Sequence, residues 1–461
     1  MLEMIIAANA WLNGIVWGPP FMILLVGTGA FLTYKLGFFQ FRYLIHSWKN
    51  SFGEMFRRDI KTEEGAISPF QAVAAAMAAT IGVGNIAGVA TALVLGGPGA
   101  IFWMWMVALV GMATKMAEAT LGLKYRHIDE NGHVSGGVFY YIEKGLGPQW
   151  KWLAVAYAFF AGVSAFGLGN MVQSNTVAQS MATGFGVPNW ITGVVLMIMV
   201  GAVTLGGISR IATTAEKIVP VMAGAYIIGA LGILAVNVTE IPTAFMMIIQ
   251  YAFEPAPAMG GFAGATVAAS IRYGIARGIF SNEAGLGSAS IVHAQARNTP
   301  FRQGFWGMWE VIIDTLVVCT LTALVILVTG VLETGENGAV LTTAAFESGL
   351  KGPGAYVIII SIVFFAYTSM LTWNFYGEKS WEYLFGQKIV LPYRLAFLGF
   401  AFIGTLGGLE LIWDIADTFN GLMAAPNLIA LVLLGGVLAK EKLDYFNQLR
   451  DKARNQLNDE S

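Results

Sequence analysis

The chain has 461 residues, of which 56% are hydrophobic and only 12% are charged, and its formal net charge is −2. Soluble domains carry about 25% charged residues, so this composition, with a mean hydropathy of +0.65, excludes an ordinary soluble domain. A single cysteine and four scattered histidines exclude disulfides within the chain and leave little from which to build a metal cluster.

Apolar runs long enough to cross a membrane recur along the whole chain, and about 20 such residues span a bilayer as a helix. The predicted transmembrane helices number about eleven and cover, in chain order, 12–34, 68–95, 98–123, 152–183, 190–206, 214–236, 262–294, 304–330, 354–376, 392–410 and 415–439. The sequence therefore predicts an all-α, multi-pass protein of the cell membrane, embedded in the lipid bilayer. No basic stripe points to nucleic acid as a partner.

The positive charges are distributed unevenly between the segments that connect these helices. If the N-terminus lies outside the cell, the connections on the inside carry 22 of the 26 Lys and Arg residues. Cytoplasmic connections of membrane proteins are enriched in these two residue types. The pattern therefore predicts an external N-terminus and a cytoplasmic C-terminus.

Two of the predicted spans are interrupted near their middle by glycine and polar residues. The first contains TIGVGNIAG at 80–88, and the second contains RGIFSNEAGLGSAS at 277–290. Glycine and asparagine weaken a helix at a depth where no water is available to the freed backbone groups. Four further spans follow each interrupted one, and five spans per unit invert the second unit relative to the first. Broken helices at matching positions of two inverted halves indicate the midplane binding site of a secondary transporter.

This arrangement predicts one extra N-terminal helix followed by a five-plus-five inverted repeat, with core helices one and six discontinuous. The predicted divisions are 1–65 for the extra helix and its cytoplasmic connection, 66–237 for the first repeat, 238–261 for an extracellular connection, 262–440 for the second repeat and 441–461 for a cytoplasmic tail. An alternative explanation of the first interruption is close helix packing through Gly84 and Gly88, which have GxxxG spacing.

Five stretches of the sequence resemble the alanine or glycine:cation symporter family, also called sodium:alanine symporters. They are ATIGVGNIAGVA, GGPGAIFWMW, SGGVFYYIEKGLG, RGIFSNEAGLGSA with AQA after it, and FAYTSMLTWNFYGEKSWEYLFG. The resemblance implies sodium-coupled import of small neutral amino acids, with alanine favoured and glycine left open, by alternating access. It also implies a leucine-transporter-type fold.

A zwitterionic substrate in a dry site needs separate partners for its carboxylate and its ammonium group. The start of a half-helix offers N–H groups and a positive dipole to the carboxylate. The end of the preceding half-helix offers carbonyls to the ammonium or to sodium, and glycine lets the backbone approach the ligand closely. The candidate substrate-binding residues of the first interruption are Ala79, Thr80, Gly82, Val83, Gly84 and Asn85.

By the resemblance, residues of three further helices face the same pocket. They are Phe280, Ser281 and Gly285 at the second interruption, Asn170 and Gln173 of core helix three, and Trp373 of core helix eight. An indole beside the substrate would leave room for a methyl group but not for an isobutyl group. The alternative is that Trp373 is an ordinary packed or interfacial tryptophan, one of 13 in the chain. The two amides lie three residues apart and share a helix face. They are expected to reach the substrate or orient a broken helix, unless they only pair with neighbouring helices.

The resemblance also implies a sodium ion between core helices one and eight. Its ligands would be the carbonyls of Ala78, Ile81 and Phe365 and the hydroxyls of Thr368 and Ser369. Adjacent hydroxyls together with carbonyls of a broken helix would form a neutral cage of oxygen atoms. The alternative is that both hydroxyls bond back to carbonyls of their own helix.

Charged residues at membrane depth provide the remaining predictions. Arg277 is a candidate for the outer gate, where it would pair with Asp414 or Asp417. Lys115 and Glu118, three residues apart, are expected to pair with each other.

Three buried acids leave an alternative coupling ion open. Glu283, Glu310 and Asp314 could carry a proton, so a proton-coupled amino-acid transporter of the same fold is the closest rival. A channel is disfavoured because no repeated carbonyl-filter sequence is present. An intramembrane enzyme is disfavoured because HEXXH is absent and no Ser–His arrangement is suggested.

Overall fold

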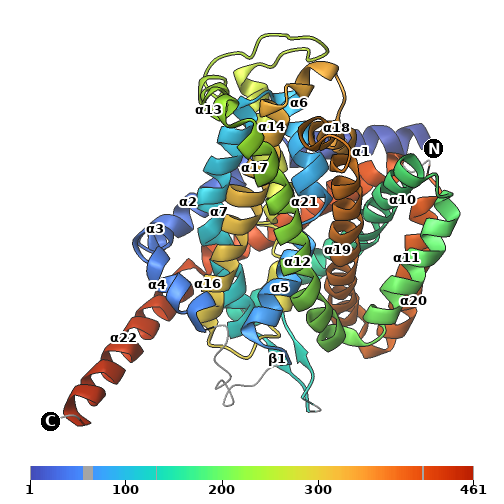
Figure 1. The fold of residues 1–461 in the computed structure, drawn as a ribbon. Helices are drawn as coiled ribbons and strands as arrows, with labels where there is room; N and C mark the ends of the chain where they lie inside the picture. Colours follow the sequence, from blue (N-terminus) through green and yellow to red (C-terminus); the bar gives the residue numbers. More distant parts are fainter. Residues whose placement is uncertain (1, 55–65, 131, 408–409, 460–461) are drawn as a thin grey trace.

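The computed structural model describes residues 2–54, 66–130, 132–407 and 410–459, and most of this chain is helical (Figure 1). The elements up to residue 236 are α1 (Leu2–Val16), α2 (Pro19–Lys35), α3 (Phe39–Arg42), α4 (Leu44–Lys49), η1 (Phe52–Glu54), α5 (Pro69–Thr80), η2 (Gly84–Gly88), α6 (Val89–Gly96), α7 (Gly99–Lys124), β1 (His127–Ile128), β2 (Val134–Ser135), α8 (Val138–Leu146), η3 (Pro148–Trp150), α9 (Lys151–Phe166), η4 (Gly167–Met171), α10 (Val172–Phe185), α11 (Asn189–Thr204) and α12 (Gly207–Val236).

The second part of the chain continues in the same style. Its elements are η5 (Val238–Glu240), α13 (Ile241–Gln250), α14 (Val267–Asn282), α15 (Ala289–His293), α16 (Pro300–Val311), η6 (Ile312–Cys319), α17 (Thr320–Val328), η7 (Val331–Thr334), α18 (Gly338–Leu350), α19 (Gly354–Phe385), η8 (Gln387–Ile389), α20 (Val390–Thr405), α21 (Glu410–Leu433) and α22 (Gly435–Asp459). Three of the short elements, η2, η4 and η6, are π-helical turns inside longer helices.

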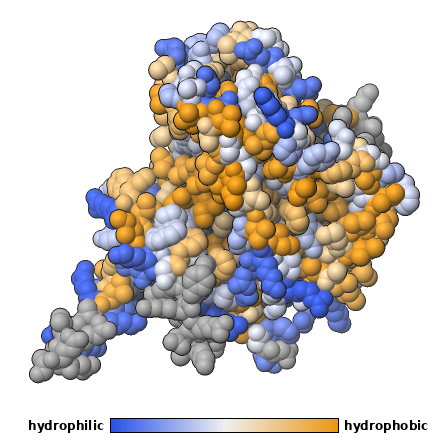
Figure 2. Space-filling view, in the orientation of Figure 1, coloured by the Kyte–Doolittle hydropathy of each residue, from blue (hydrophilic) through white to orange (hydrophobic). Residues whose placement is uncertain are grey.

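The helices have the length and the surface of a multi-pass membrane protein. In the described chain eight helices are long and apolar enough to cross a membrane, or nine if one bent pair counts as a span. The helices α11 and α14 have 16 residues each and are shorter than a full span. Figure 2 shows hydrophobic side chains over the middle of the body and hydrophilic ones toward its two ends. The predicted helical class is confirmed, whereas the number eleven and the inverted repeat stay predictions.

The first predicted interruption is confirmed as a bend between α5 and the helix that follows it. The helix α5 begins at Pro69, and its N-cap residue Ser68 accepts a hydrogen bond from the N–H of Gln71 in a capping box. It ends at Thr80, and the helix that resumes at Gly84 is turned by 49°. The three residues between the two halves, Ile81, Gly82 and Val83, therefore end the helix within a candidate span.

The second predicted interruption is confirmed between α14 and α15. The helix α14 ends at Asn282, and α15 begins only at Ala289. Glu283, Gly285 and Gly287 all have positive φ, at 56°, 101° and 80°. Such angles cost little for glycine and are uncommon for other residues, so Glu283 is held in this conformation by its surroundings.

Several predicted boundaries need correction. The first predicted span, 12–34, lies within one candidate span, Ile6–Lys35, but contains a short break, because α1 ends at Val16 and α2 begins at Pro19. Proline is tolerated at the start of a helix but interrupts one that is already running. The last predicted span, 415–439, ends at Leu433, and the separate helix α22 extends away from the body (Figure 1).

The packing brings the two interruptions together at the centre of the molecule. The helix α7 packs against both α14 and α16, and α19 packs against α5, α9 and α12. The turn η2 contacts α14 and η6. At one edge of the body, α11 and α20 lie side by side (Figure 1). The helix α18, within a connection for which no helix was predicted, packs on η2 and α6.

Candidate functional site

The two interrupted helices touch each other at predicted site residues. A Cβ atom on Gly84 would lie 3.3 Å from Cδ1 of Phe280 and 3.5 Å from Cα of Ser281. Asn85 Nδ2 donates a hydrogen bond to Ser281 Oγ at 3.0 Å. Nothing lies within 4 Å of the Cβ position of Gly88, so the GxxxG packing alternative applies to Gly84 alone. The structure therefore brings these residues of the first and second interruptions into one site.

Asn85 supplies the polar partners that the first interruption leaves unsatisfied. Its Oδ1 accepts a hydrogen bond from the N–H of Gly82 at 2.8 Å, and its Nδ2 donates to Asp314 Oδ1 at 2.7 Å. The other carboxylate oxygen of Asp314 accepts from Ser281 Oγ at 2.9 Å and Thr315 Oγ1 at 2.8 Å. All of these side chains are buried. The cluster joins η2, α14 and η6, and Asp314 was not among the predicted binding residues.

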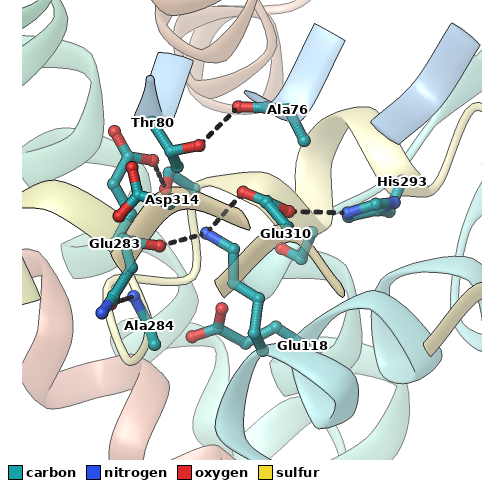
Figure 3. A network of polar contacts seen from close by, with 12 residues as sticks. Ala76, Thr80, Glu118, Glu283, Ala284, His293, Glu310 and Asp314 are labelled. Carbon is teal, nitrogen blue, oxygen red and sulfur yellow. Dashed lines mark hydrogen bonds and ion pairs between the residues drawn. The ribbon is translucent and has the colours of Figure 1, made fainter. Parts of the chain in front are cut away.

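A buried ion pair lies beside the second interruption. Lys115 Nζ is 3.0 Å from Glu310 Oε1 and donates to the carbonyl oxygen of Asn282, the last residue of α14, at 2.9 Å. Glu310 Oε2 also lies 3.2 Å from Nε2 of His293, and Figure 3 shows the carboxylate turned toward that ring. The predicted pairing of Lys115 with Glu118 is therefore wrong, because the lysine reaches across to a different helix.

Glu118 instead binds the backbone of the second interruption. Its Oε1 accepts hydrogen bonds from the N–H groups of Gly285 at 2.9 Å and Gly287 at 3.0 Å, and from Asn427 Nδ2 at 2.6 Å. The carbonyl oxygen of Gly285 accepts from the same amide of Asn427 at 2.9 Å. Backbone groups freed by a helix break must find partners when buried. Both backbone polar groups of Gly285 therefore have partners on α7 and α21, and its place at the substrate pocket stays a prediction.

The residues proposed as sodium ligands gather where α5 ends against α19. Ser369 Oγ donates to the carbonyl oxygens of Ala78 at 3.1 Å and Ala79 at 3.3 Å. A Cβ on Gly82 would lie 2.7 Å from that hydroxyl oxygen, so only glycine allows this approach. Thr368 Oγ1 donates to the carbonyl oxygen of Phe365 at 3.1 Å.

The alternative, that both hydroxyls bond back to carbonyls of their own helix, therefore holds for Thr368 but not for Ser369. Thr368 bonds back to its own helix, at Phe364 as well as Phe365. Ser369 instead joins α19 to α5. Thr80 Oγ1 bonds back to Ala76 at 3.5 Å, and Ile81 follows the end of α5 directly.

The amides of core helix three lie in and after the π-helical turn η4. Asn170 Nδ2 donates to the carbonyl oxygen of Phe397 on α20 at 2.7 Å, and Gln173 Nε2 donates to that of Leu168 at 3.2 Å. The donor of Asn170 therefore links this helix to α20, as the alternative interpretation proposed, whereas the donor of Gln173 bonds back within its own helix. Their acceptor oxygens are buried, and no donor among the described residues reaches them. A Cβ on Gly169 would overlap the side chain of Trp373, so η4 and α19 are in close contact.

The three candidate gate residues line one cavity of about 450 Å³, together with Val83 and Phe280. The Arg277 guanidinium lies over the Phe280 ring, 5.5 Å from its centroid. Among the described residues, no ion pair joins Arg277 to Asp414 or Asp417. Asp417 Oδ2 instead accepts from Asn13 of α1 at 3.1 Å. The outer gate therefore stays a prediction: its three residues line the same cavity, but in the described part of the chain they form no ion pair with one another.

Comparisons with known proteins agree with each other over nearly the whole chain. The sequence model of a family described as the sodium:alanine symporter family matches residues 2–459. The chain is 50% identical over 451 residues to the sodium/alanine symporter AgcS of Methanococcus maripaludis, covering 96% of this chain and 98% of that protein. It is 37% identical over 458 residues to the putative sodium/proton-dependent alanine carrier protein YrbD of Bacillus subtilis, covering 95% and 92%.

The fold is similar to that of MhsT, solved in complex with L-phenylalanine. The TM-score is 0.57, and the match covers 82% of this chain and 99% of that one. At 13% identity this likeness concerns the fold alone. It confirms the expected leucine-transporter-type fold.

Proposed function

The chain belongs to the sodium:alanine symporter family, whose members are secondary transporters rather than enzymes, and we propose that it imports small neutral amino acids together with sodium. Amino-acid symport across the membrane follows from the family, since 50% identity to AgcS extends over almost the whole chain. The identity of the ion, the size of the substrate and the residues of the site are our proposals. The observation that carries them is the contact between the two interruptions, with Ser369 of α19 at the end of α5.

The substrate carboxylate is assigned to the start of the half-helix Gly84–Gly96. The first N–H groups of a helix have no partners within it, and they carry the positive end of the helix dipole. Gly82 and Gly84 leave these groups uncovered by a side chain of their own, and the amide of Asn85 holds Gly82 in place. The ammonium group is assigned to the carbonyl oxygens of Ala79 and Thr80 at the end of α5.

Sodium is assigned to the oxygen atoms between α5 and α19. Rotation of the Ser369 hydroxyl would release its proton from the Ala78 carbonyl, so that both oxygens could face one cation. Such an ion would bridge two helices and stabilise the arrangement in which the substrate site is complete. A ligand that prefers one arrangement shifts the population toward it. Sodium and substrate would therefore raise each other's affinity.

A proton-coupled transporter is the second candidate, and Asp314 is the observation that favours it. This carboxylate is fully buried and contacts Asn85, Ser281 and Thr315 of the site. YrbD, one relative, is named as a putative sodium/proton-dependent carrier. Buried acids inside membrane proteins often mark proton pathways. In this alternative Asp314 would bind and release the coupling proton.

Equilibrium binding to the purified protein separates the two proposals. Alanine binding is measured at several sodium concentrations with choline as the replacement cation, and each series is repeated at different pH values. The sodium proposal expects the apparent affinity for alanine to rise with sodium at every pH. An apparent alanine affinity that changes with pH but not with sodium concentration would contradict the sodium proposal and support proton coupling through Asp314.

A further inference from the structure

One hydrogen bond links the second interruption to the tryptophan proposed to limit substrate size. Trp373 Nε1 donates to Glu283 Oε1 at 3.1 Å. Both side chains are buried, with exposed fractions of 2% and 4%. The second carboxylate oxygen of Glu283 accepts a hydrogen bond from the hydroxyl of Ser288. The carboxylate is therefore held by one residue of the second interruption and itself holds the indole.

Glu283 occupies a backbone position that few residues adopt. Its φ of 56° lies in the left-handed region, and it follows directly on the end of α14. A residue other than glycine in this region is strained, and such strain is frequent at functional sites. Among the described residues, only Phe38 and Lys351 share this property with it outside the glycines. From this position the Glu283 carboxylate reaches Trp373 of α19.

The other sides of the Trp373 indole are enclosed by packing. Gly169 of η4 lies so close that any side chain there would overlap the tryptophan. The ring of Tyr376 lies edge-on, with centroids 5.5 Å apart and an interplanar angle of 73°. Packing on these two sides leaves the polar edge of the ring to be fixed by Glu283. An indole N–H buried without a partner would cost free energy, so it strongly favours the orientation that meets the carboxylate.

We infer that Glu283 is the positioning residue that orients the Trp373 indole and thereby sets the upper size limit of the transported amino acid. This inference rests on the proposed function, in which the indole faces the substrate side chain. It gives Glu283 a role in selectivity in place of the proton-carrying role considered from the sequence. It also connects the size limit to α14, because Glu283 follows directly on the end of that helix.

The test measures relative uptake of valine and alanine by variants in proteoliposomes. Glu283→Leu removes the acceptor and should raise the valine-to-alanine ratio by about tenfold, the lower end of the discrimination that one methylene group gives in a hydrophobic pocket. Glu283→Gln retains an acceptor oxygen and should keep the ratio of the unchanged protein. Trp373→Phe removes the indole N–H that donates this hydrogen bond, so it should also raise the ratio. Adding Glu283→Leu to Trp373→Phe should raise the ratio little further, because the hydrogen bond is already lost.

Two controls separate this inference from general loosening and from failure of the proposed function. Thr320→Val removes the partner of another tryptophan, Trp105, whose Nε1 donates to Thr320 Oγ1 at 2.8 Å. It should leave the ratio unchanged, and an equal increase there would overturn the inference. Trp373→Ala should broaden the substrate range. If it does so while Glu283→Leu and Trp373→Phe keep the original ratio, the inference fails and the proposed function stands. If Trp373→Ala itself changes nothing, the assignment of Trp373 to the pocket fails as well.

Should Glu283→Leu not fold, the comparison rests on Ser288→Ala, which frees the second carboxylate oxygen of Glu283 and leaves Trp373 intact, against Glu283→Gln. An increased ratio in the first and an unchanged ratio in the second supports the inference. Equal ratios in the two variants overturn it.

Discussion

The double variant Thr368→Val, Ser369→Ala tests the proposed sodium site independently of the substrate site. Ser369 Oγ lies 3.1 Å from the Ala78 carbonyl oxygen, so its removal takes away an oxygen at the junction of α5 and α19. Thr368 bonds back to Phe364 and Phe365, so its hydroxyl must turn to reach an ion. Methyl groups replace neither oxygen. We therefore expect Ser369→Ala to have a larger effect than Thr368→Val.

The expected size of the effect follows from the number of ligands removed. The double variant loses two of the five proposed oxygen ligands. Leaving a polar group without its buried partner costs about 1–3 kcal/mol, and each 1.4 kcal/mol corresponds to about a tenfold change in affinity. The sodium concentration that half-saturates alanine binding should therefore rise at least about tenfold. At saturating sodium the affinity for alanine should largely recover, because no proposed substrate contact is altered.

The assay is alanine binding to purified protein across a sodium titration, and the chain offers a matched control. Thr372, one turn further along α19, donates to the carbonyl oxygen of Ala75 at 2.8 Å but is not a proposed ligand. Thr372→Val removes a hydroxyl between the same two helices and should leave the sodium dependence unchanged. The reasoning is refuted if the double variant keeps the original sodium dependence. An equal shift in Thr372→Val would show that helix contact, rather than ion binding, was measured.

Three further predictions address other parts of the molecule. Gly84→Leu should abolish transport while membrane insertion persists, since its side chain would collide with the second interruption and cover the assigned carboxylate position. Uptake at the original rate would contradict this and restore helix packing as the explanation for the glycine. Lys115→Met should lower the free energy of unfolding by about 3–5 kcal/mol, because it leaves Glu310 buried without its ion pair; thermal denaturation in detergent measures this, and adding Glu310→Gln should recover part of the loss. Arg277→Gln should slow alanine uptake while preserving alanine binding if the arginine acts only at the gate, and equal losses of both would place it in the binding site.

The interrupted helices could be predicted from the sequence because their cause is local. The glycines around Asn85 and those after Glu283 weaken a helix wherever they stand, so the positions of both breaks followed from the residue types. The contact of Ser369 with Ala78 was anticipated only through the resemblance to a known family. Periodicity alone says nothing about which helices become neighbours.

The partners of the buried charges could not be predicted, since they depend on packing between distant segments. Lys115 and Glu118 share a helix face, yet the lysine pairs with Glu310 and the glutamate binds the N–H groups of Gly285 and Gly287. The sequence shows where a helix break frees backbone N–H groups, but it does not show which side chain will accept their hydrogen bonds. The contacts of Asp314 with Asn85 and Ser281 were missed for the same reason, although its position four residues after Glu310 in an apolar span showed that it needed partners.

The central claim, that sodium drives the import of a small neutral amino acid, is tested most directly by uptake into proteoliposomes with one gradient imposed at a time. Alanine accumulation is measured with an inward sodium gradient at equal pH, and then with an inward proton gradient in the absence of sodium. We predict accumulation above equilibrium with the sodium gradient alone, and its loss when an ionophore dissipates that gradient. Accumulation driven by the proton gradient alone, with none under the sodium gradient, would contradict the account.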